Sequence, residues 1–360
     1  MMRWITTALL VLCLLSATAF AENDKASLNA ALDEALQVPP DLVVPDVPEV
    51  AAEIAQIVGE QRKGLEATLA RSGRYVSAIE AKLAAKKLPR GLVALAMQES
   101  AFRPDAVSRT GAAGLWQFKP ATARLLRMRR DAFVDSRFDF ETATDRAADY
   151  LADLYSEFED WDFAMAAYNW GRGAVASCRV ANPGKSFWTL VREGKVRDET
   201  AKYVPRIYAL LTILRDPQKH GFEPPKDDAP VTVKLPPLCD LAALEKEATI
   251  ESGALRALNP QLRTGYAPPY DAYRTVYATP EMKAAIEKLS ADAKLQALTG
   301  KPGKLRGLSR IQVTIAKGHT LWSLSRTYDT SVESILEYNG WTATPTLSVG
   351  DKVMIYKKTE

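Results

Sequence analysis

The sequence predicts a mainly α-helical protein that ends in a small βααβ domain. Apolar residues recur at helical spacing between about residues 50 and 220, and no strand pattern occurs before about residue 230. Near the C-terminus the pattern changes, because the alternating segments 311–315 and 352–356 enclose two short helical segments. A chain of 360 residues has room for two or three domains with sizeable cores.

Residues 1–21 predict a cleavable secretory signal peptide. Arg3 precedes an apolar run from Ile5 to Leu15, and Ala19-Phe20-Ala21 has the small-residue pattern of a cleavage site. This run is too short to cross a bilayer and no later segment is apolar enough, so we expect a periplasmic protein with no mature membrane span. Cys13 follows a leucine where a lipobox has a small residue, and a lipid anchor is therefore not expected.

Charge and composition argue against several functions. The net charge of +3 is nearly balanced, so nucleic acid is not an expected partner. The histidines, His220 and His319, and the isolated cysteines lack the spacing of metal ligands, and we expect neither a metal nor another cofactor. Cys178 and Cys239 fall in different predicted domains. Both a disulfide and two free buried thiols are compatible with their positions.

Shifts in composition divide the rest of the chain. Residues 22–70 predict a proline-containing linker and a helix, and residues 71–220 a helical domain. Residues 221–300 begin with a linker rich in Pro, Lys and Asp, and residues 310–357 form the βααβ domain.

The helical domain contains a short helix with an acid on its apolar face. Pro89 suits the first turn and Pro104 lies beyond the end. Glu99 lies four residues after Leu95 and seven after Leu92, so its carboxyl projects from the apolar stripe. Burial and the negative end of the helix dipole raise the pKa of a carboxyl, as a general acid requires near neutral pH. From this helix alone, the alternative is a structural glutamate paired with a nearby arginine.

The next segment combines a glycine turn with an aromatic ring and an amide. It reads Gly111-Ala112-Ala113-Gly114 and then Leu115-Trp116-Gln117-Phe118. Glycines permit a tight backbone path, Trp116 offers a flat surface, and Gln117 offers an amide donor and acceptor, which together suit a sugar. With Glu99-Ser100, these residues resemble the signature of the goose-type-lysozyme-like lytic transglycosylases, and within them the membrane-bound lytic murein transglycosylase D family.

Two later motifs extend the resemblance. Ala167-Tyr168-Asn169 matches the family motif whose tyrosine and asparagine line the saccharide cleft, although Asn169 before a Gly-x-Gly is also an ordinary helix end. The run from Glu199 to Pro205 matches the motif that brings a tyrosine hydroxyl to the catalytic carboxyl, whereas an isolated tyrosine is usually a half-buried core residue. The resemblance implies a lysozyme-like catalytic domain with Glu99 as sole acid and base. It also implies substrate-binding roles for Ser100, Trp116, Gln117, Tyr168, Asn169 and Tyr203.

The βααβ domain resembles a lysin motif, a module that binds glycans containing N-acetylglucosamine. The segments Lys317 to Trp322 and Tyr338-Asn339-Gly340 carry this resemblance, and His319 replaces the usual aspartate. Residues 238–280 loosely resemble the degenerate lysin-motif-like segment that follows the catalytic domain in relatives.

The resemblance implies cleavage of peptidoglycan glycan strands without water. Glu99 would protonate the glycosidic oxygen between N-acetylmuramic acid and N-acetylglucosamine. It would then accept the proton of the muramoyl C6 hydroxyl, which attacks C1 and leaves a 1,6-anhydro end. Two alternatives remain: a hydrolysing muramidase, which a second carboxylate in the cleft would favour, and a wall-binding protein without activity.

Overall fold

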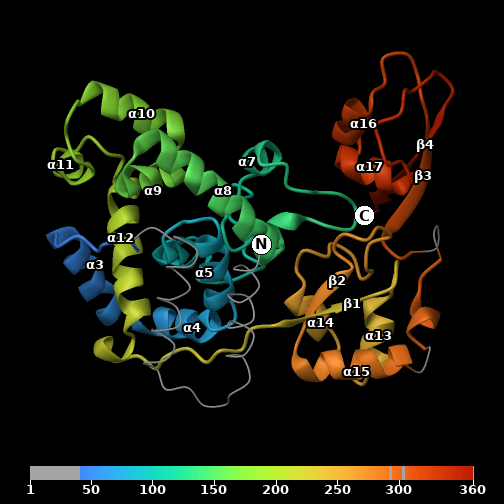
Figure 1. Cartoon of the computed structure of the whole chain (residues 1–360), viewed down its shortest axis with the longest axis horizontal. Coiled ribbons are helices and arrows are strands. Elements are labelled where there is room, and N and C mark those ends of the chain that lie inside the picture. The colour runs from blue at the N-terminus through green and yellow to red at the C-terminus, as the bar shows by residue number, and fades with distance from the viewer. Residues whose placement is uncertain (1–40, 292–293, 302–304, 360) are drawn as a thin grey trace, which may run out of the picture.

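The computed structural model describes residues 41–291, 294–301 and 305–359 (Figure 1). The predicted signal peptide at 1–21, with Cys13, lies outside these residues. Within the described part of the chain, no helix is both long and apolar enough to cross a membrane.

The N-terminal two thirds of the described chain form a helical domain around one hydrophobic core, which confirms the predicted class. Within the described residues, the first strand begins at Val231. Its α-helices are α3 (Pro48–Gly59), α4 (Arg62–Ser72), α5 (Val76–Ala85), α6 (Val93–Ser100), α7 (Pro120–Leu125), α8 (Phe140–Phe158), α9 (Trp161–Trp170), α10 (Arg172–Ala181), α11 (Phe187–Arg192) and α12 (Asp198–Arg215), and its 3₁₀ turns are η2 (Arg90–Leu92), η3 (Ser136–Phe138) and η4 (Gln218–His220).

Helix α6 lies at the centre of this domain and packs against α12. The stretch predicted as one helix begins with the 3₁₀ turn η2 and continues as α6, in which the five residues Val93–Met97 are all buried. The helix ends because Ala101 and Phe102 both adopt the left-handed conformation, with φ of 52° and 54°. The fully buried Phe102 anchors this turn. The last turn of α6, which carries Glu99, is therefore held rigidly.

The structure adds two details to the predicted helices. Helices α3 and α4 share the main core, through Val50 and Ile57 of α3 and Leu69 of α4. Helix α12 starts at Asp198 and contains Pro205 in its interior. Burial of Pro205 among its apolar neighbours compensates for the missing backbone donor.

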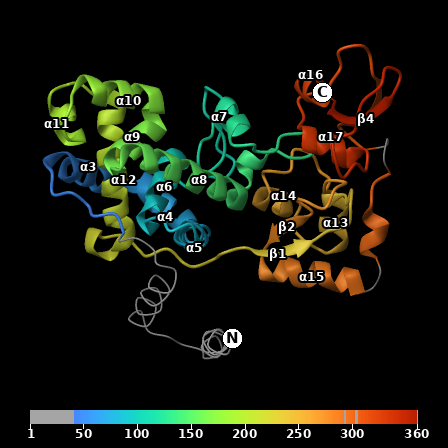
Figure 2. The same cartoon turned by 45° about the horizontal axis from the view of Figure 1, so that its top comes forward.

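Two βααβ modules follow the helical domain (Figures 1 and 2). In each module the two strands pair antiparallel. Helix α15 (Pro280–Ala291) and the turn η5 (Leu295–Leu298) lie between the modules. The first module consists of β1 (Val231–Lys234), α13 (Leu241–Glu247), α14 (Ala254–Leu258) and β2 (Thr275–Ala278), and the second of β3 (Leu308–Thr314), α16 (Leu321–Thr327), α17 (Val332–Tyr338) and β4 (Lys352–Lys358).

The two modules share one hydrogen-bond pattern. After α14, the Asn259 amide donates to the carbonyl of Tyr277 at 2.8 Å, and its oxygen accepts from the Tyr277 N–H at 2.8 Å. After α17, Asn339 makes the same pair of bonds with Met354, at 2.9 and 2.8 Å. Each asparagine thus ties the end of the second helix to the last strand. The segment 238–280, whose folding the sequence left open, lies within a module of the same topology as the C-terminal one.

A hairpin of the helical domain, residues 129–136, contacts both modules. Its Asp131 is fully buried and accepts hydrogen bonds from the hydroxyls of Tyr270 and Ser334, both at 2.6 Å. The ring of Phe133 packs against aromatic rings of both modules. These contacts fix the modules against the helical domain.

The two cysteines of the described chain are free thiols. Cys239 is buried in the core of the first module, whereas Cys178 lies on the helical domain. In this structure Cys178 and Cys239 are therefore two separate thiols and do not form a disulfide.

Candidate active site

Glu99 lies partly buried in the last turn of α6, where the apolar spacing predicted it. Burial raises the pKa of its carboxyl to about 7, and the negative charge of Glu199 acts in the same direction. A hydrogen bond from the Tyr203 hydroxyl and the positive charge of Lys119 lower the pKa but do not offset burial. The predicted rise in pKa is confirmed. The partner of the carboxyl is a phenol, not the arginine of the alternative reading.

Tyr203 projects from α12 toward Glu99 and is buried. Burial and the neighbouring Glu99 carboxyl raise the pKa of this phenol well above its usual value, so it remains a hydrogen-bond donor across the physiological range. A donor that always points at the same oxygen restricts the rotamer of Glu99. Tyr203 thus positions the acid from behind and does not line the cleft.

A cleft with a volume of about 530 Å³ opens beside Glu99. Four of the residues predicted from the sequence line it: Glu99, Gln117, Tyr168 and Asn169. Residues to which the sequence analysis gave no role in the site also line it, among them Ser108, Thr110, Lys119, Tyr150, Arg197 and Glu199. Hydroxyl groups, amides and side chains of both charges therefore surround Glu99. The surface of this cleft suits a polar, hydroxyl-rich ligand.

The glycine turn before Gln117 is required by packing. Gly114 has a φ of 76°, and a Cβ there would lie 1.8 Å from the carbonyl oxygen of Arg137. Gln117 follows with a φ of 47°, and its amide nitrogen donates to the carbonyls of Gly114 at 2.8 Å and Ala106 at 3.2 Å. Within the described residues no donor reaches its Oε1. This oxygen is available to accept a hydrogen bond from a ligand in the cleft.

Asn169 links α9 to α12. Its Oδ1 accepts hydrogen bonds from the Thr200 hydroxyl at 2.7 Å and from Arg197 at 2.9 Å, and its Nδ2 donates to Glu199 at 3.1 Å. The helix ends because Gly171 follows with a φ of 98°, so Asn169 is not the residue that terminates it. On the same helix, the Tyr168 hydroxyl donates to the carbonyl of Trp116 at 2.8 Å.

Besides Tyr203, two predicted site residues do not reach the cleft surface. Trp116 is fully buried and its indole N–H donates to the Thr144 hydroxyl at 2.9 Å, so its ring cannot stack on a ligand. The expected stacking surface is corrected to a core position, because burying a large ring with its N–H satisfied is favourable. Ser100 is also buried, and its hydroxyl lies 3.2 Å from the carbonyl of Ala96. Both residues support the cleft from below.

The sequence analysis gave Glu199 no role of its own, although this residue begins the motif that ends at Pro205. Its carboxylate lies in the cleft, accepts from the amide of Asn169 and pairs with Arg197 at 3.3 Å. The signal was present, since Glu199 and Tyr203 are four residues apart on one helix and therefore share a face. Within the described residues, no group of three or more His, Cys, Asp or Glu side chains is arranged to hold a metal ion.

Two family models match parts of this chain. The profile of the Transglycosylase SLT domain matches residues 77–191, and that of the LysM domain matches residues 313–355. The residues matched to the SLT domain include Glu99 and all the residues that line its cleft except Arg197 and Glu199, and those matched to the LysM domain fall in the second βααβ module.

Among curated proteins, this chain is similar to membrane-bound lytic murein transglycosylase D of Escherichia coli, with 28% identity over 288 residues. The match covers 75% of this chain and 60% of the relative, so the chain spans well under the relative's full length. Membrane-bound lytic murein transglycosylase F of Maricaulis maris is 35% identical over 164 residues, covering 42% of this chain and 33% of that protein.

Among solved structures, the 70-kDa soluble lytic transglycosylase of Escherichia coli is 23% identical with a TM-score of 0.37, covering 57% of this chain and 32% of that chain. An inactive mutant of lytic transglycosylase Slt from Pseudomonas aeruginosa is 24% identical with a TM-score of 0.34, covering 41% and 25%.

Proposed function

We propose that this protein is a peptidoglycan lytic transglycosylase that cleaves the β-1,4 bond between N-acetylmuramic acid and N-acetylglucosamine. The observation that carries the proposal is Glu99: a carboxyl with a pKa of about 7, held by a buried phenol, at the edge of a polar cleft in an SLT domain. A group with this pKa is protonated in part at neutral pH and can both donate and accept a proton.

The proposed reaction has two steps. In the first, protonated Glu99 donates its proton to the glycosidic oxygen, and the bond to muramoyl C1 breaks as the N-acetylglucosamine leaving group departs. In the second, the Glu99 carboxylate accepts the proton of the muramoyl C6 hydroxyl while its oxygen bonds to C1, which regenerates the acid. The Tyr203 hydroxyl stabilises the carboxylate formed between the steps. The nucleophile is part of the substrate, so its proximity lowers the barrier.

The cleft residues orient the sugar in this proposal. The free Oε1 of Gln117 accepts from an acetamido N–H or a hydroxyl, and the Tyr168 ring shapes the wall beside it. Asn169 is fixed by Thr200 and Arg197 and presents its edge to the same space. Ser100 and Trp116 contribute by supporting these elements from the core.

The alternative is a muramidase that uses water. Glu199 favours it, because hydrolysis generally requires a second carboxylate in the cleft. Against it, the Glu199 carboxylate is already engaged by Arg197 and by the amide of Asn169. We therefore assign Glu199 to positioning Asn169 and keeping the pKa of Glu99 high.

We also propose that the second βααβ module binds the glycan strand and that the first does not. In the first module, the loop between α14 and β2 is paired by its backbone with the helical domain: Asp135 N–H donates to Gln261 at 2.9 Å and Arg263 N–H to Phe133 at 2.7 Å. The corresponding loop of the second module, residues 339–351, is mostly exposed. Only the second module matches the LysM profile.

The predicted domain limits and location belong to the same proposal. The relatives are named as membrane-bound enzymes acting on murein, which supports a place in the cell envelope. We assign the protein to the periplasm, exported by the signal peptide at 1–21, with residues 71–220 as the catalytic domain and 310–357 as the lysin motif.

The test compares the wild type with Glu99→Gln on purified sacculi. We expect lysis by the variant to fall on the order of a hundredfold to ten-thousandfold, because a general acid is lost. Co-sedimentation with sacculi should be unchanged. Equal lysis by both proteins would refute the role of Glu99, and no lysis by either, with binding intact, would favour the wall-binding protein without activity.

A further inference from the structure

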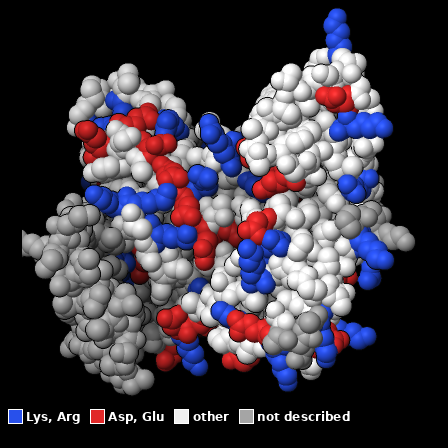
Figure 3. Space-filling model, turned by 45° about the vertical axis from the view of Figure 1, so that its right-hand side comes forward, with Lys and Arg blue, Asp and Glu red and all other residues white. Residues whose placement is uncertain are grey.

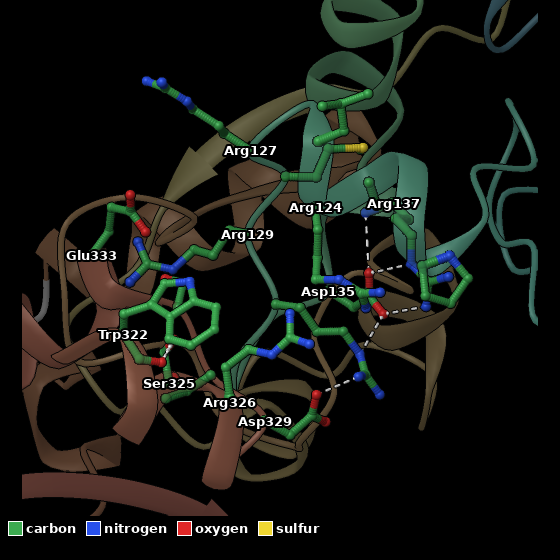
Figure 4. Close-up of a pocket in the computed structure, with 17 residues that line it drawn as sticks. Arg124, Arg127, Arg129, Asp135, Arg137, Trp322, Ser325, Arg326, Asp329 and Glu333 are labelled. Atoms are coloured by element: carbon green, nitrogen blue, oxygen red, sulfur yellow. Dashed lines mark hydrogen bonds and ion pairs between the residues drawn. The ribbon is translucent and has the colours of Figure 1, made fainter. Parts of the chain in front are cut away.

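A second cleft, larger than the one at Glu99, lies between the helical domain and the second module. Its volume is about 710 Å³, and it opens between α7 on one side and α16 on the other (Figure 4). We call it the α7–α16 cleft. Figure 3 shows the surface hollowed between the helical domain and the C-terminal module, with basic side chains at the hollow.

Charged side chains that pair with one another form the floor of the α7–α16 cleft. Asp135 pairs with Arg137 at 2.7 Å and with Arg130 at 3.3 Å, and Arg130 also pairs with Asp329 of the second module. Arg129 pairs with the buried Asp131 at 2.9 Å. Of these pairs, the one between Arg130 and Asp329 joins the helical domain to the second module across the cleft.

The rim of the cleft carries arginines that form no ion pair among the described residues. Arg124 of α7, Arg127 just after it and Arg326 of α16 are exposed, and none has a carboxylate within salt-bridge distance among the described residues. Among the described acids that line the cleft, Asp135 and Asp329 form ion pairs, and Glu333 at the first turn of α17 forms none. Three unpaired guanidinium groups against one carboxylate leave a rim that attracts anions, and a guanidinium fork matches a carboxylate geometrically.

Apolar surface accompanies this charge. Trp322 is 66% exposed and Leu125 is 76% exposed, and they face the cleft from α16 and from the end of α7. Arg326 lies 5.4 Å from the Trp322 ring, which orients both side chains. An exposed aromatic ring beside unpaired arginines is typical of a binding surface.

The α7–α16 cleft adjoins the catalytic cleft. Lys119 and Thr122 line the cleft at Glu99, whereas Pro120, Ala123 and Arg124 line the second cleft. The short helix α7 is therefore a wall common to both. A side branch of a strand bound at Glu99 needs only to pass this one helix to reach the arginines.

We propose that the α7–α16 cleft binds the carboxylate-bearing peptide stems of peptidoglycan, an inference that rests on the proposed function. These stems combine free carboxyl groups with small apolar side chains, which match the unpaired Arg124, Arg127 and Arg326 and the exposed Trp322. The lactyl carboxylate of a peptide-free strand is a second source of the same chemistry. The test separates the two.

The probe is a soluble disaccharide-peptide fragment of peptidoglycan that lacks the cleavable bond, beside the same fragment with its carboxyl groups converted to amides. We expect the full chain to bind the acidic fragment roughly tenfold more tightly, because each exposed ion pair is worth at most about fivefold and more than one arginine contributes. Arg124→Glu with Arg326→Glu should remove this difference. The matched control, Arg306→Glu with Arg310→Glu, makes the same charge change on exposed arginines outside the cleft and should leave it intact. If the double variant fails to fold, Trp322→Ala carries the test and should weaken binding about threefold.

Several outcomes would overturn the proposal. Equal affinity for the acidic and amidated fragments would exclude carboxylate recognition, and equal loss in the control would show a general charge effect. A preference for peptide-free strands would assign the cleft to the lactyl carboxylate, and binding to anionic vesicles instead of the fragments would assign it to a membrane surface. Cleavage of purified sacculi by the wild type is measured in parallel, and its absence would refute the proposed function. Cleavage of peptide-free strands that is unchanged between the wild type and the variant confines the effect to the stem.

Discussion

Replacing Glu99 by glutamine should stabilise the protein while abolishing its activity. The carboxyl has a pKa of about 7 in the folded protein against 4.5 as the reference value, chiefly because it is buried. Between these values the folded state binds more protons than the unfolded state, so wild-type stability falls as the pH rises through this window. Glutamine keeps an oxygen that accepts from Tyr203 and carries no charge to desolvate.

The size of the effect follows from the shift. One pKa unit corresponds to about 1.4 kcal/mol, so ionising Glu99 costs the folded state about 3 kcal/mol above pH 7. Glu99→Gln should therefore match the wild type in free energy of unfolding near pH 4, and exceed it by up to about 3 kcal/mol at pH 8.

The assay is equilibrium urea unfolding of both proteins from pH 4 to pH 8, followed by the fluorescence of the helical domain's tryptophans. Glu223→Gln, which removes an exposed carboxyl outside the cleft, is the matched control and should differ from the wild type by less than about 0.5 kcal/mol at every pH. A Glu99→Gln stabilisation that does not grow with pH would refute the buried, high-pKa acid on which the mechanism depends.

Three further predictions test the neighbours of Glu99 and the contact between domains. Tyr203→Phe removes a hydrogen bond that lowers the pKa of Glu99, so the alkaline limb of the kcat/KM profile should move to higher pH, with a rate loss of about tenfold or more; an unmoved limb would show that the phenol does not act on the acid. Glu199→Gln should retain activity within about tenfold if Glu199 only positions Asn169, whereas a loss on the order of a hundredfold or more would identify it as the second carboxylate of a hydrolase. Asp131→Ala leaves Arg129 and two backbone N–H groups of the hairpin without their buried acceptor, so unfolding should cost about 3 kcal/mol less and limited proteolysis should separate the modules sooner; unchanged resistance to protease would show that the hairpin does not hold them.

The sequence predicted Glu99 well because a single physical rule, an acid on an apolar stripe, determines both its position and its pKa. It also predicted the strands and helices of the second module, where alternation and capping signals are local: the Thr320 side chain accepts from the Ser323 N–H in a capping box at the start of α16. Local pattern was sufficient in both cases.

Local sequence patterns did not predict the positions of Trp116 and Glu199 in the structure. A tryptophan in a glycine-rich segment can face a ligand or the core. Trp116 faces the core, where its indole N–H donates to the hydroxyl of Thr144, a residue of α8 that is distant in sequence. Glu199 entered the cleft because α12 packs against α6 and α9, which no local pattern encodes. The asparagine repeat that relates the two modules likewise depends on contacts between α-helices and strands separated by loops of different length.

The most direct test of the central claim is the mass of the fragments that the wild-type protein releases from purified sacculi. Attack by the muramoyl C6 hydroxyl predicts products lighter by one water molecule than those of a muramidase, each ending in a 1,6-anhydro sugar. Reducing-end products of the full mass would contradict the account, because water would then be the nucleophile and Glu199 the first candidate for the carboxylate that activates it.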